Sequence, residues 1–432
     1  MSFSESVAFL YSLGNEVLSM KLGLETVRAL AHALGNPQKN FPAVHIAGTN
    51  GKGSTAVMVE AILRAAGYRT ALYTSPNLVS ITERYQVDGR EIDQDGFALL
   101  ATKVRQASEQ LVADGLLDAP PTFFEQVTMI AYLYFAERQI DVAVLEVGMG
   151  GRLDATNICR PIVTAITPVG FDHQKYLGDT LSAIAGEKAG IIKANIPVVV
   201  APQQEESMQV ISARAEKLNA PLISVADASF TAQPDGEFGQ YRLSYRDYDA
   251  LLSLRGRHQA VNAMTAIEIV EQLKSAGWKI DKTAIETGLS KAVWPGRLQL
   301  IELPDLPAKL LIDGAHNVDG VRALRSFLLE HCRGIHITLI FGSLNDKAVV
   351  GMAELIFPIA QTVILTKADN ARSAEPAEIA EQTKQIRQDA IYSGNLAEAL
   401  REAARLTPAN GLIVVCGSLY LAGELLKLVK SY

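Results

Sequence analysis

Four segments of the chain carry the side chains best suited to chemistry, and the first of them is a loop rich in glycine. Gly48–Thr55, "GTNGKGST", places three glycines around Lys52 and ahead of Ser54. Backbone N–H groups exposed by glycines at the start of a helix bind phosphate oxygens, and a lysine extends such a site to the terminal phosphates. Gly53 separates Lys52 from Ser54, so the loop departs from the usual GxxxxGK[ST] pattern. We still predict a phosphate site rather than a plain glycine-rich turn.

Three further segments, two loops and one helical stretch, carry acidic or basic residues, and the two loops could bind a metal ion. Glu146 interrupts an apolar run and three glycines follow it. A buried carboxylate is unfavourable unless it is paired or metal-bound. We favour Mg²⁺ over a salt bridge to a lysine or arginine, because the carboxyl end of this expected strand faces the glycine loop. Asp172 and His173 follow another apolar run, and for His173 a structural role and a ligand role both stay open. Lys188 lies in an apolar helical segment, where the alternative to a site residue is a helix-surface lysine paired with Glu187 or a neighbouring carboxylate.

The elements that must position these loops are short apolar runs that alternate with helical patterns such as 123–137 and 181–191. Runs rich in Val and Ile are typical of strands buried on both faces, and their alternation with helices predicts βαβ units and a mostly parallel sheet. Active sites in such sheets lie at the carboxyl ends of the strands. The expected strands are Ala43–Ala47, Arg69–Tyr73, Asp141–Val147, Ile162–Thr167 and Pro197–Ala201.

The chain of 432 residues is too long for one ordinary core and predicts at least two α/β domains. Residues 1–294 are expected to form a P-loop-containing, mostly parallel sheet domain. Within it, period-two alternation over 227–254 predicts a small antiparallel insert, and a helical region over 259–289 follows. Residues 295–432 are expected to form a smaller, Rossmann-like domain, with a ligand cleft between the two. Its expected strands are Lys309–Ile312, Ile335–Phe341, Thr362–Lys367 and Leu412–Cys416.

Composition excludes several classes of protein. The net charge of -7 argues against a nucleic-acid surface, which needs clustered Lys and Arg. The three cysteines form no CxxC pair, which argues against a disulfide framework or a zinc site. The N-terminal segment lacks the basic region of a signal peptide, and no apolar run approaches the ~18–20 residues of a membrane span. We therefore expect a cytoplasmic protein with neither a membrane nor a nucleic-acid partner.

Seven motifs, taken in order, give the chain a resemblance to the folylpolyglutamate synthase and bifunctional dihydrofolate synthase family of the muramyl-ligase superfamily. The motifs are "GTNGKGST", "TSPNL", "LEVGMGGRLDATN", "FDHQKYLGDT", "GEKAGI", "PGR" and "DGAHN". The resemblance runs from about Ser19 to the C-terminus. It implies a monomeric ATP-dependent acid–amino-acid ligase of folate biosynthesis and one-carbon metabolism. In this family ATP phosphorylates a carboxylate, and the amine of L-glutamate then displaces phosphate from the acyl phosphate.

The resemblance also implies a role for each site residue. Lys52, His173 and Lys188 would be catalytic, and a carbamate on Lys188 would turn this cation into an anion able to bind Mg²⁺. Two Mg²⁺ ions are implied, one held by Ser75 and Glu146 and the second by His173. The implied ATP-binding residues are Thr49, Asn50, Gly51, Lys52, Gly53, Ser54, Asn262, Arg297, Asp313 and His316, and the implied folate-binding residues are Phe124, Asp154 and Ala155.

Two of these implications leave alternatives open. Phe123 is expected to be a core aromatic residue, whereas Phe124 could stack on the pterin or belong to the core. Asn77 stands where the family usually has histidine, as in "TSPHL", and asparagine keeps a hydrogen-bonding side chain but cannot carry a charge. We expect activity to survive this departure, while the contacts of this loop with folate stay open.

The acceptor and the class of activity also leave alternatives. The acceptor could be dihydropteroate, reduced folates such as tetrahydrofolate (poly)glutamates, or both, and we favour both. A monofunctional folylpolyglutamate synthase and an amide ligase with another carboxylate acceptor are the alternatives. A UDP-muramyl-peptide ligase would need a further domain ahead of the glycine loop, and a P-loop switch would need a strict GK[ST]. A kinase that stops at the phosphorylated product would turn over ATP without glutamate.

Overall fold

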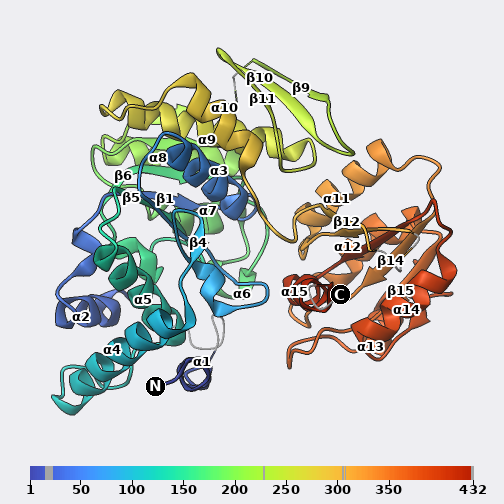
Figure 1. Cartoon of the computed structure of the whole chain (residues 1–432), viewed down its shortest axis with the longest axis horizontal. Coiled ribbons are helices and arrows are strands. Elements are labelled where there is room, and N and C mark those ends of the chain that lie inside the picture. The colour runs from blue at the N-terminus through green and yellow to red at the C-terminus, as the bar shows by residue number, and fades with distance from the viewer. Residues whose placement is uncertain (15–22, 227–228, 304–305, 307, 430–432) are drawn as a thin grey trace. The chain divides into compact units, whose positions relative to one another are not determined.

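A computed structural model describes residues 1–14, 23–226, 229–303, 306 and 308–429 (Figure 1). The chain divides into two compact units. Ser19 and Asp227, where the family resemblance and the predicted insert begin, lie outside the described residues. The predicted domain boundary at 294/295 stays a prediction. The first unit comprises Met1–Thr231, Leu243–Ala250 and Val261–Ala292, and the second comprises Ala232–Arg242, Leu251–Ala260 and Val293–Tyr432.

The first unit is built on a sheet of eight strands among the described residues, in the order β4-β3-β2-β5-β1-β6-β7-β8. β1 at its centre pairs in parallel with β5 and β6, and only β3 and β4 run antiparallel to their neighbours. All five predicted strands are present with small shifts at their ends, which confirms the α/β class. The strands are β1 (Ala43–Ala47), β2 (Thr70–Tyr73), β3 (Tyr85–Val87), β4 (Arg90–Glu91), β5 (Val142–Glu146), β6 (Pro161–Ile166), β7 (Val198–Val200) and β8 (Leu222–Ser224).

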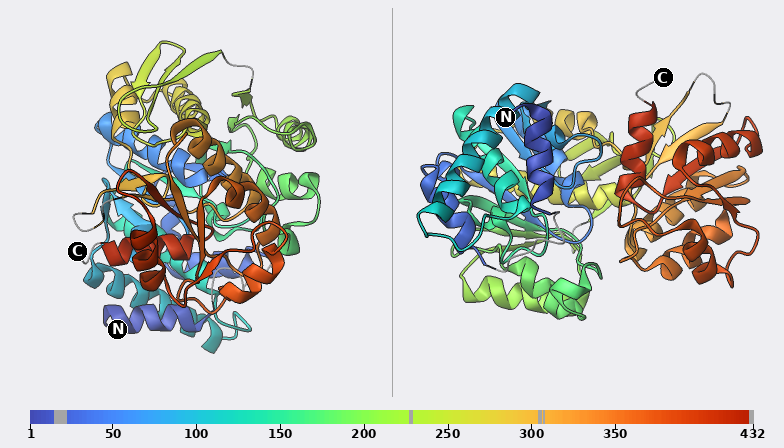
Figure 2. Two further views of the ribbon diagram at one scale, coloured as in Figure 1. Left: turned by 90° about the vertical axis from the view of Figure 1, so that its right-hand side faces the viewer. Right: turned by 90° about the horizontal axis from the view of Figure 1, so that it is seen from below.

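Helices cover both faces of this sheet (Figures 1 and 2). One face packs on α1, α2, α4 and α5 to form a large apolar core. On the other side α3 packs against α10, where Gly288 lies so close that an added Cβ would meet the backbone of Ile62 at 2.4 Å. The helices are α1 (Phe3–Ser12), α2 (Glu25–Ala33), α3 (Lys52–Ala65), α4 (Gln94–Ala113), α5 (Phe123–Glu137), α6 (Gln174–Leu177), α7 (Leu181–Ala189), α8 (Glu205–Lys217), α9 (His258–Ser275) and α10 (Lys282–Lys291).

The predicted insert contains three strands, β9 (Phe230–Pro234), β10 (Tyr241–Tyr245) and β11 (Tyr248–Leu251). They form a sheet of order β11-β10-β9. Two residues connect β10 to β11, and only antiparallel strands can be joined by so short a link. The predicted helical region after the insert consists of α9 and α10. It breaks at Gly277, whose φ of +96° ends the first helix, and Asp281 caps the second.

The second unit has a mostly parallel sheet of six strands, counted over the residues described, in the order β12-β13-β17-β14-β15-β16. β12 alone is antiparallel to its neighbour. The core between this sheet and α11, α12 and α13 is apolar. The four predicted strands are present, and β12 and β16 are additions. The elements are β12 (Gln299–Ile301), β13 (Lys309–Ile312), α11 (Val318–His331), β14 (Ile337–Phe341), α12 (Val349–Ile356), β15 (Thr362–Leu365), α13 (Pro376–Thr383), β16 (Ile391–Tyr392), α14 (Leu396–Leu406), β17 (Leu412–Cys416) and α15 (Leu419–Val429).

The helices of the described ranges are too short or too polar to cross a membrane.

Candidate active site

The glycine loop joins β1 to α3, and its geometry depends on glycine. Gly51 has φ +86° and stands directly before the first residue of α3, Lys52. A Cβ on Gly51 would lie 2.4 Å from Oδ1 of Asn262, and one on Gly48 would lie 1.8 Å from Oγ1 of Thr167. These positions therefore combine a left-handed backbone with close packing, which only glycine accommodates. The first N–H groups of α3 have no partners within the helix, which is the arrangement that binds phosphate.

Hydrogen bonds tie the glycine loop to the loop that follows β6. The hydroxyl of Thr49 bonds both the carbonyl oxygen and the N–H of Gly170, each at 3.0 Å. The N–H groups of Thr49 and Asn50 donate to the carbonyl oxygen of Pro168 at 3.0 and 3.3 Å. Lys52 Nζ donates to the carbonyl oxygen of Thr49 at 3.2 Å. The structure therefore brings the predicted phosphate loop beside the loop that carries Asp172 and His173.

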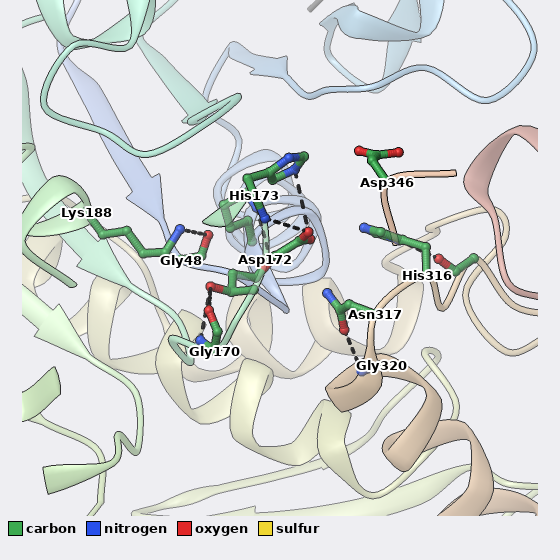
Figure 3. A network of polar contacts seen from close by, with 12 residues as sticks. Gly48, Gly170, Asp172, His173, Lys188, His316, Asn317, Gly320 and Asp346 are labelled. Atoms are coloured by element: carbon green, nitrogen blue, oxygen red, sulfur yellow. Dashed lines mark hydrogen bonds and ion pairs between the residues drawn. The ribbon is translucent and has the colours of Figure 1, made fainter. Parts of the chain in front are cut away.

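Lys188 reaches the same loop from α7. Its side chain is only 3% exposed, and Nζ donates to the carbonyl oxygen of Gly48 at 2.8 Å (Figure 3). Burial, with a smaller contribution from the charge of Lys52, lowers the pKa of Lys188 to about 7. The alternative of a helix-surface lysine is wrong, because the Lys188 side chain is buried, and Glu187 forms its ion pair with Arg152 at 2.8 Å.

Glu146 and Ser75 meet at the carboxyl ends of β5 and β2. Glu146 is the last residue of β5 and is 5% exposed. The backbone N–H of Ser75 donates to Oε2 of Glu146 at 3.2 Å. The loop after β2 and the end of β5, which lie 71 residues apart in the sequence, are thereby brought together, as the rule for parallel sheets predicts.

His173 and Asp172 lie after β6. His173 adopts a left-handed backbone with φ +52°, which is unusual for a residue other than glycine. Its N–H donates to Oδ1 of Asp172 at 2.9 Å, and its Nε2 lies 3.9 Å from Oδ2 (Figure 3). The ring is 26% exposed, so it can reach a ligand. Among the residues that the structure describes, no group of three or more His, Cys, Asp or Glu side chains forms a ready-made metal site.

The loop after Glu146 is folded around Asp154. This buried carboxylate accepts hydrogen bonds from the N–H of Met149 at 2.9 Å, from the N–H of Thr156 at 3.0 Å and from the Thr156 hydroxyl. Burial raises the pKa of Asp154, and these hydrogen bonds oppose that effect. Ala155 is buried and begins a short 3-10 helix, Ala155–Ile158. Asp154 thus shapes the loop where the sequence implied a folate-binding residue.

Phe124 lies directly on this loop. A Cβ on Gly148 would come within 2.3 Å of Cζ of Phe124, so the ring covers the backbone at Gly148. Phe123 is 1% exposed, which confirms it as a core aromatic residue. Phe124 is partly buried at the border of the same core.

The predicted residues of the second unit gather after β13. Asp313 is 7% exposed, and its two carboxylate oxygens accept from the N–H groups of Leu298 and Ala315, both at 2.9 Å. Burial raises the pKa of Asp313, and the nearby charge of Arg297 opposes this. His316 Nδ1 lies 2.9 Å from the carbonyl oxygen of Gly314, and Asn317 caps α11 through the N–H of Gly320 (Figure 3). Asn262, which the resemblance also implies to bind ATP, lies in the first unit beside Gly51.

Two structural partners of these loops gave no signal in the sequence. Arg84 is buried, donates from Nε to Oδ1 of Asn77 at 2.7 Å and lies over the ring of Phe123. His45 on β1 is fully buried and bonds Thr156. An arginine inside "TERY" is ordinarily a solvated residue, and a single histidine in a strand is ordinarily a core residue. A pairwise contact across 111 residues, as between His45 and Thr156, leaves no local pattern.

Comparison with known proteins agrees with this geometry. Residues 46–270 match the Mur ligase middle domain, and residues 296–419 match the Mur ligase glutamate ligase domain. A Bacillus subtilis (strain 168) protein named dihydrofolate synthase/folylpolyglutamate synthase is 35% identical, covering 96% of this chain and 97% of its own length.

Two solved structures are also similar over nearly the whole chain. Mycobacterium tuberculosis folylpolyglutamate synthase complexed with ADP and AMPPCP has a TM-score of 0.87 and 31% identity, covering 98% of this chain and 99% of its own. E. coli FolC in complex with DHPP and ADP has a TM-score of 0.86 and 27% identity, covering 100% and 98%. The chain therefore belongs to the folylpolyglutamate synthase/dihydrofolate synthase family of the Mur ligases.

Proposed function

We propose that this chain is an ATP-dependent ligase that adds L-glutamate to dihydropteroate and to tetrahydrofolate (poly)glutamates, as a cytoplasmic monomer. The observation that carries the proposal is the arrangement of Lys52, Lys188 and Glu146 around the ends of β1 and β5 in a chain of this family. The name of the Bacillus subtilis relative covers both activities, and the E. coli structure contains DHPP with ADP, which supports a pterin-bearing acceptor.

ATP phosphates fit the glycine loop. The N-terminal N–H groups of α3 offer donors to phosphate oxygens, and Lys52 adds a positive charge. The proposed phosphate set is Thr49, Asn50, Gly51, Lys52, Gly53 and Ser54. Asn262 beside Gly51, together with Arg297, Asp313 and His316 of the second unit, is the proposed set for the rest of ATP.

Mg²⁺ fits the oxygen ligands that Glu146 and Ser75 present. Mg²⁺ keeps several waters and is usually bound by one or two carboxylates plus substrate phosphates, so a site with few protein ligands suits it. Glu146 and Ser75 are the proposed residues for one ion, and His173 for a second. When bound, Mg²⁺ neutralises the charge on the phosphoryl group in transfer.

The reaction has two steps. An oxygen of the acceptor carboxylate attacks the γ-phosphorus, the bond to the β–γ bridging oxygen breaks, and ADP leaves. The glutamate amine then attacks the acyl carbon, loses a proton, and displaces phosphate together with the original carboxylate oxygen. Lys52 stabilises the negative charge on the transferred group, and Phe124, Asp154 and Ala155 form or shape the proposed acceptor pocket.

Lys188 is proposed to carry a carbamate. With a pKa near 7, a large fraction of its amines is neutral at physiological pH, and the neutral amine can add to CO₂ with loss of one proton. The product is an anion beside the phosphate loop, where the unmodified side chain is a cation. A ¹³C NMR carbamate signal after exposure to ¹³C-bicarbonate, absent in Lys188→Met, tests this assignment.

Phosphate release by the purified protein tests the proposed function. Assays with Mg-ATP and L-glutamate would contain dihydropteroate, tetrahydrofolate or no acceptor. Release that requires glutamate and occurs with both acceptors supports the proposal. Release with tetrahydrofolate alone would identify a monofunctional folylpolyglutamate synthase. Turnover that needs an acceptor but no glutamate would indicate a kinase, and no acceptor-dependent release would contradict a folate ligase.

A further inference from the structure

A buried chain of hydrogen bonds connects the central strand of the first unit to the loop after Glu146. His45 lies in the middle of β1, and its Nε2 is 2.8 Å from Oγ1 of Thr156. The Thr156 hydroxyl bonds Oδ1 of Asp154 at 2.5 Å. Oδ2 of Asp154 accepts from the N–H of Met149 at 2.9 Å. These bonds lead from β1 to the turn at Gly148 and Met149, two to three residues beyond Glu146.

The direction of each bond follows from counting protons. Asp154 receives two backbone N–H groups and the Thr156 hydroxyl, which is the pattern of an ionised carboxylate that only accepts. The Thr156 hydroxyl has one proton and gives it to Asp154. His45 must therefore donate from Nε2, and its Nδ1 is the bare nitrogen.

The surroundings of His45 agree with this tautomer. Within the described part of the chain, Nδ1 of His45 has no hydrogen-bond partner. A proton on Nδ1 would bury an unpaired N–H and would take the Thr156 proton away from Asp154. Burial, with a smaller contribution from the charge of Lys193, lowers the pKa of His45 to about 3, so the ring is neutral.

We propose that His45 is a positioning residue for the acceptor site, acting through Thr156 and Asp154 on the turn at Gly148 and Met149. This inference rests on the proposed function for the identity of the acceptor, a pterin-bearing carboxylate. The Phe124 ring lies on Gly148, so the orientation of that turn sets the position of the ring. The hydroxyl of Tyr132 on α5 donates to the carbonyl oxygen of Thr156 at 2.7 Å and holds the middle of the chain in place.

The effect should fall on the acceptor rather than on ATP. The glycine loop is fixed by its own bonds, from Thr49 to Gly170 and from Lys188 to Gly48, and none of these includes His45, Thr156 or Asp154. Loosening the turn at Gly148 therefore leaves the proposed phosphate site in place.

Matched variants test the proposal by kinetics. Thr156→Val removes the hydroxyl at nearly constant volume, and Thr156→Ser keeps it. His45→Leu removes the Nε2 donor, and His45→Gln keeps a donor near the same position. We expect Thr156→Val and His45→Leu to raise the KM for the pteroate acceptor about tenfold, with the KM for ATP within about twofold and with Thr156→Ser and His45→Gln near wild type. Equal acceptor KM values in Thr156→Val and Thr156→Ser, or equal increases for ATP and acceptor, would overturn it.

A second readout does not depend on activity. In protein with ¹⁵N-labelled histidine, the His45 signal, assigned by its loss in His45→Gln, should show the Nε2–H tautomer. The Met149 amide should exchange with solvent faster in Thr156→Val than in Thr156→Ser. An Nδ1–H tautomer or equal exchange rates overturn the proposal whatever the enzyme assay gives. The predicted NMR result in a protein that uses no pteroate acceptor would instead contradict the proposed function and leave the positioning chain standing.

Discussion

The two units both place polar residues after parallel strands, but they use them differently. In the first unit, Lys188 and Glu146 are nearly fully buried beside glycine loops, and Lys188 donates only to a backbone carbonyl among the bonds described above. In the second unit, both oxygens of Asp313 accept hydrogen bonds from N–H groups of its own loops. A strand-end position thus carries a proposed metal ligand, Glu146, in the first unit and a loop-shaping group, Asp313, in the second.

The surroundings of these buried groups indicate which substitutions should affect the reaction. A buried charge is unfavourable unless its surroundings compensate it, and the backbone donors around Asp313 provide that compensation within the fold. For Lys188, burial outweighs the opposing attraction of Asp172, Asp154 and Glu187, so its pKa falls to about 7. Substitutions in the first unit should therefore change the reaction rate, and those around Asp313 should change stability and ATP affinity.

Glu146→Gln should give the largest effect. The amide keeps the size of the side chain and can still accept from Ser75, but it lacks the charge to bind Mg²⁺, so kcat/KM should fall roughly 10²–10³-fold. Steady-state phosphate release measures this, and urea unfolding should show no loss of stability. The control is Glu187→Gln, which removes the ion pair with Arg152. Activity within about twofold of wild type in Glu146→Gln would contradict the assignment of Glu146 as an Mg²⁺ ligand.

Lys188→Met should abolish the pH dependence that the buried amine gives to stability. The folded pKa of about 7 lies below the ordinary 10.5, so between these values the unfolded chain binds more protons and wild-type stability rises with pH. In CO₂-free buffer, the unfolding free energy of wild type should therefore gain a few kcal/mol relative to Lys188→Met from pH 7 to pH 10. Parallel curves for the two proteins would mean that the pKa of Lys188 is not lowered in the folded state.

Asp313→Asn should act on the second unit and spare chemistry. An amide has one acceptor oxygen and turns an N–H₂ group toward a backbone N–H, so unfolding should become easier by about 1–3 kcal/mol. The KM for ATP should rise about tenfold with kcat little changed. Asp319→Asn, at a half-exposed pair with Arg322, is the matched control. A fall in kcat without a change in the KM for ATP would mean that Asp313 acts on the reaction step and not on ATP binding.

Asn77→His should have the smallest effect. Above pH 7 a neutral imidazole can replace the amide as acceptor for Arg84, and activity should stay within about threefold of wild type. Near pH 6 the ring becomes protonated, because the ordinary pKa of histidine is about 6.5, and its charge then opposes Arg84. The ratio of variant to wild-type activity should therefore fall as the pH is lowered. A ratio that does not change with pH would show that Asn77 does not set the position of Arg84.

Sequence reasoning succeeded where the determinants are local. The strands β1, β13 and β17 and the helix α5 have the predicted bounds, because continuous Val and Ile runs and the Thr122 capping box are visible in a short window. The structure also contains β3, β4, β8, β12 and β16, which were not predicted, since a strand of two or three residues gives little periodic signal.

The site was predictable only in part for the same reason. The meeting of Ser75 with Glu146 follows from the rule for parallel strands. The burial of Lys188 against Gly48 and the bond from His45 to Thr156 depend on tertiary packing between distant segments. The resemblance implied a role for Asp154 in folate binding, and the structure shows this carboxylate accepting N–H groups from its own loop.

In the proposed mechanism the γ-phosphate passes to a carboxylate oxygen of the acceptor, and isotope transfer tests this step. Dihydropteroate labelled with ¹⁸O in its carboxylate would be turned over with Mg-ATP and L-glutamate, and the released phosphate analysed by mass spectrometry. Each released phosphate should carry one ¹⁸O atom. Phosphate without ¹⁸O, at a rate equal to product formation, would mean that no acyl phosphate forms and would contradict the mechanism.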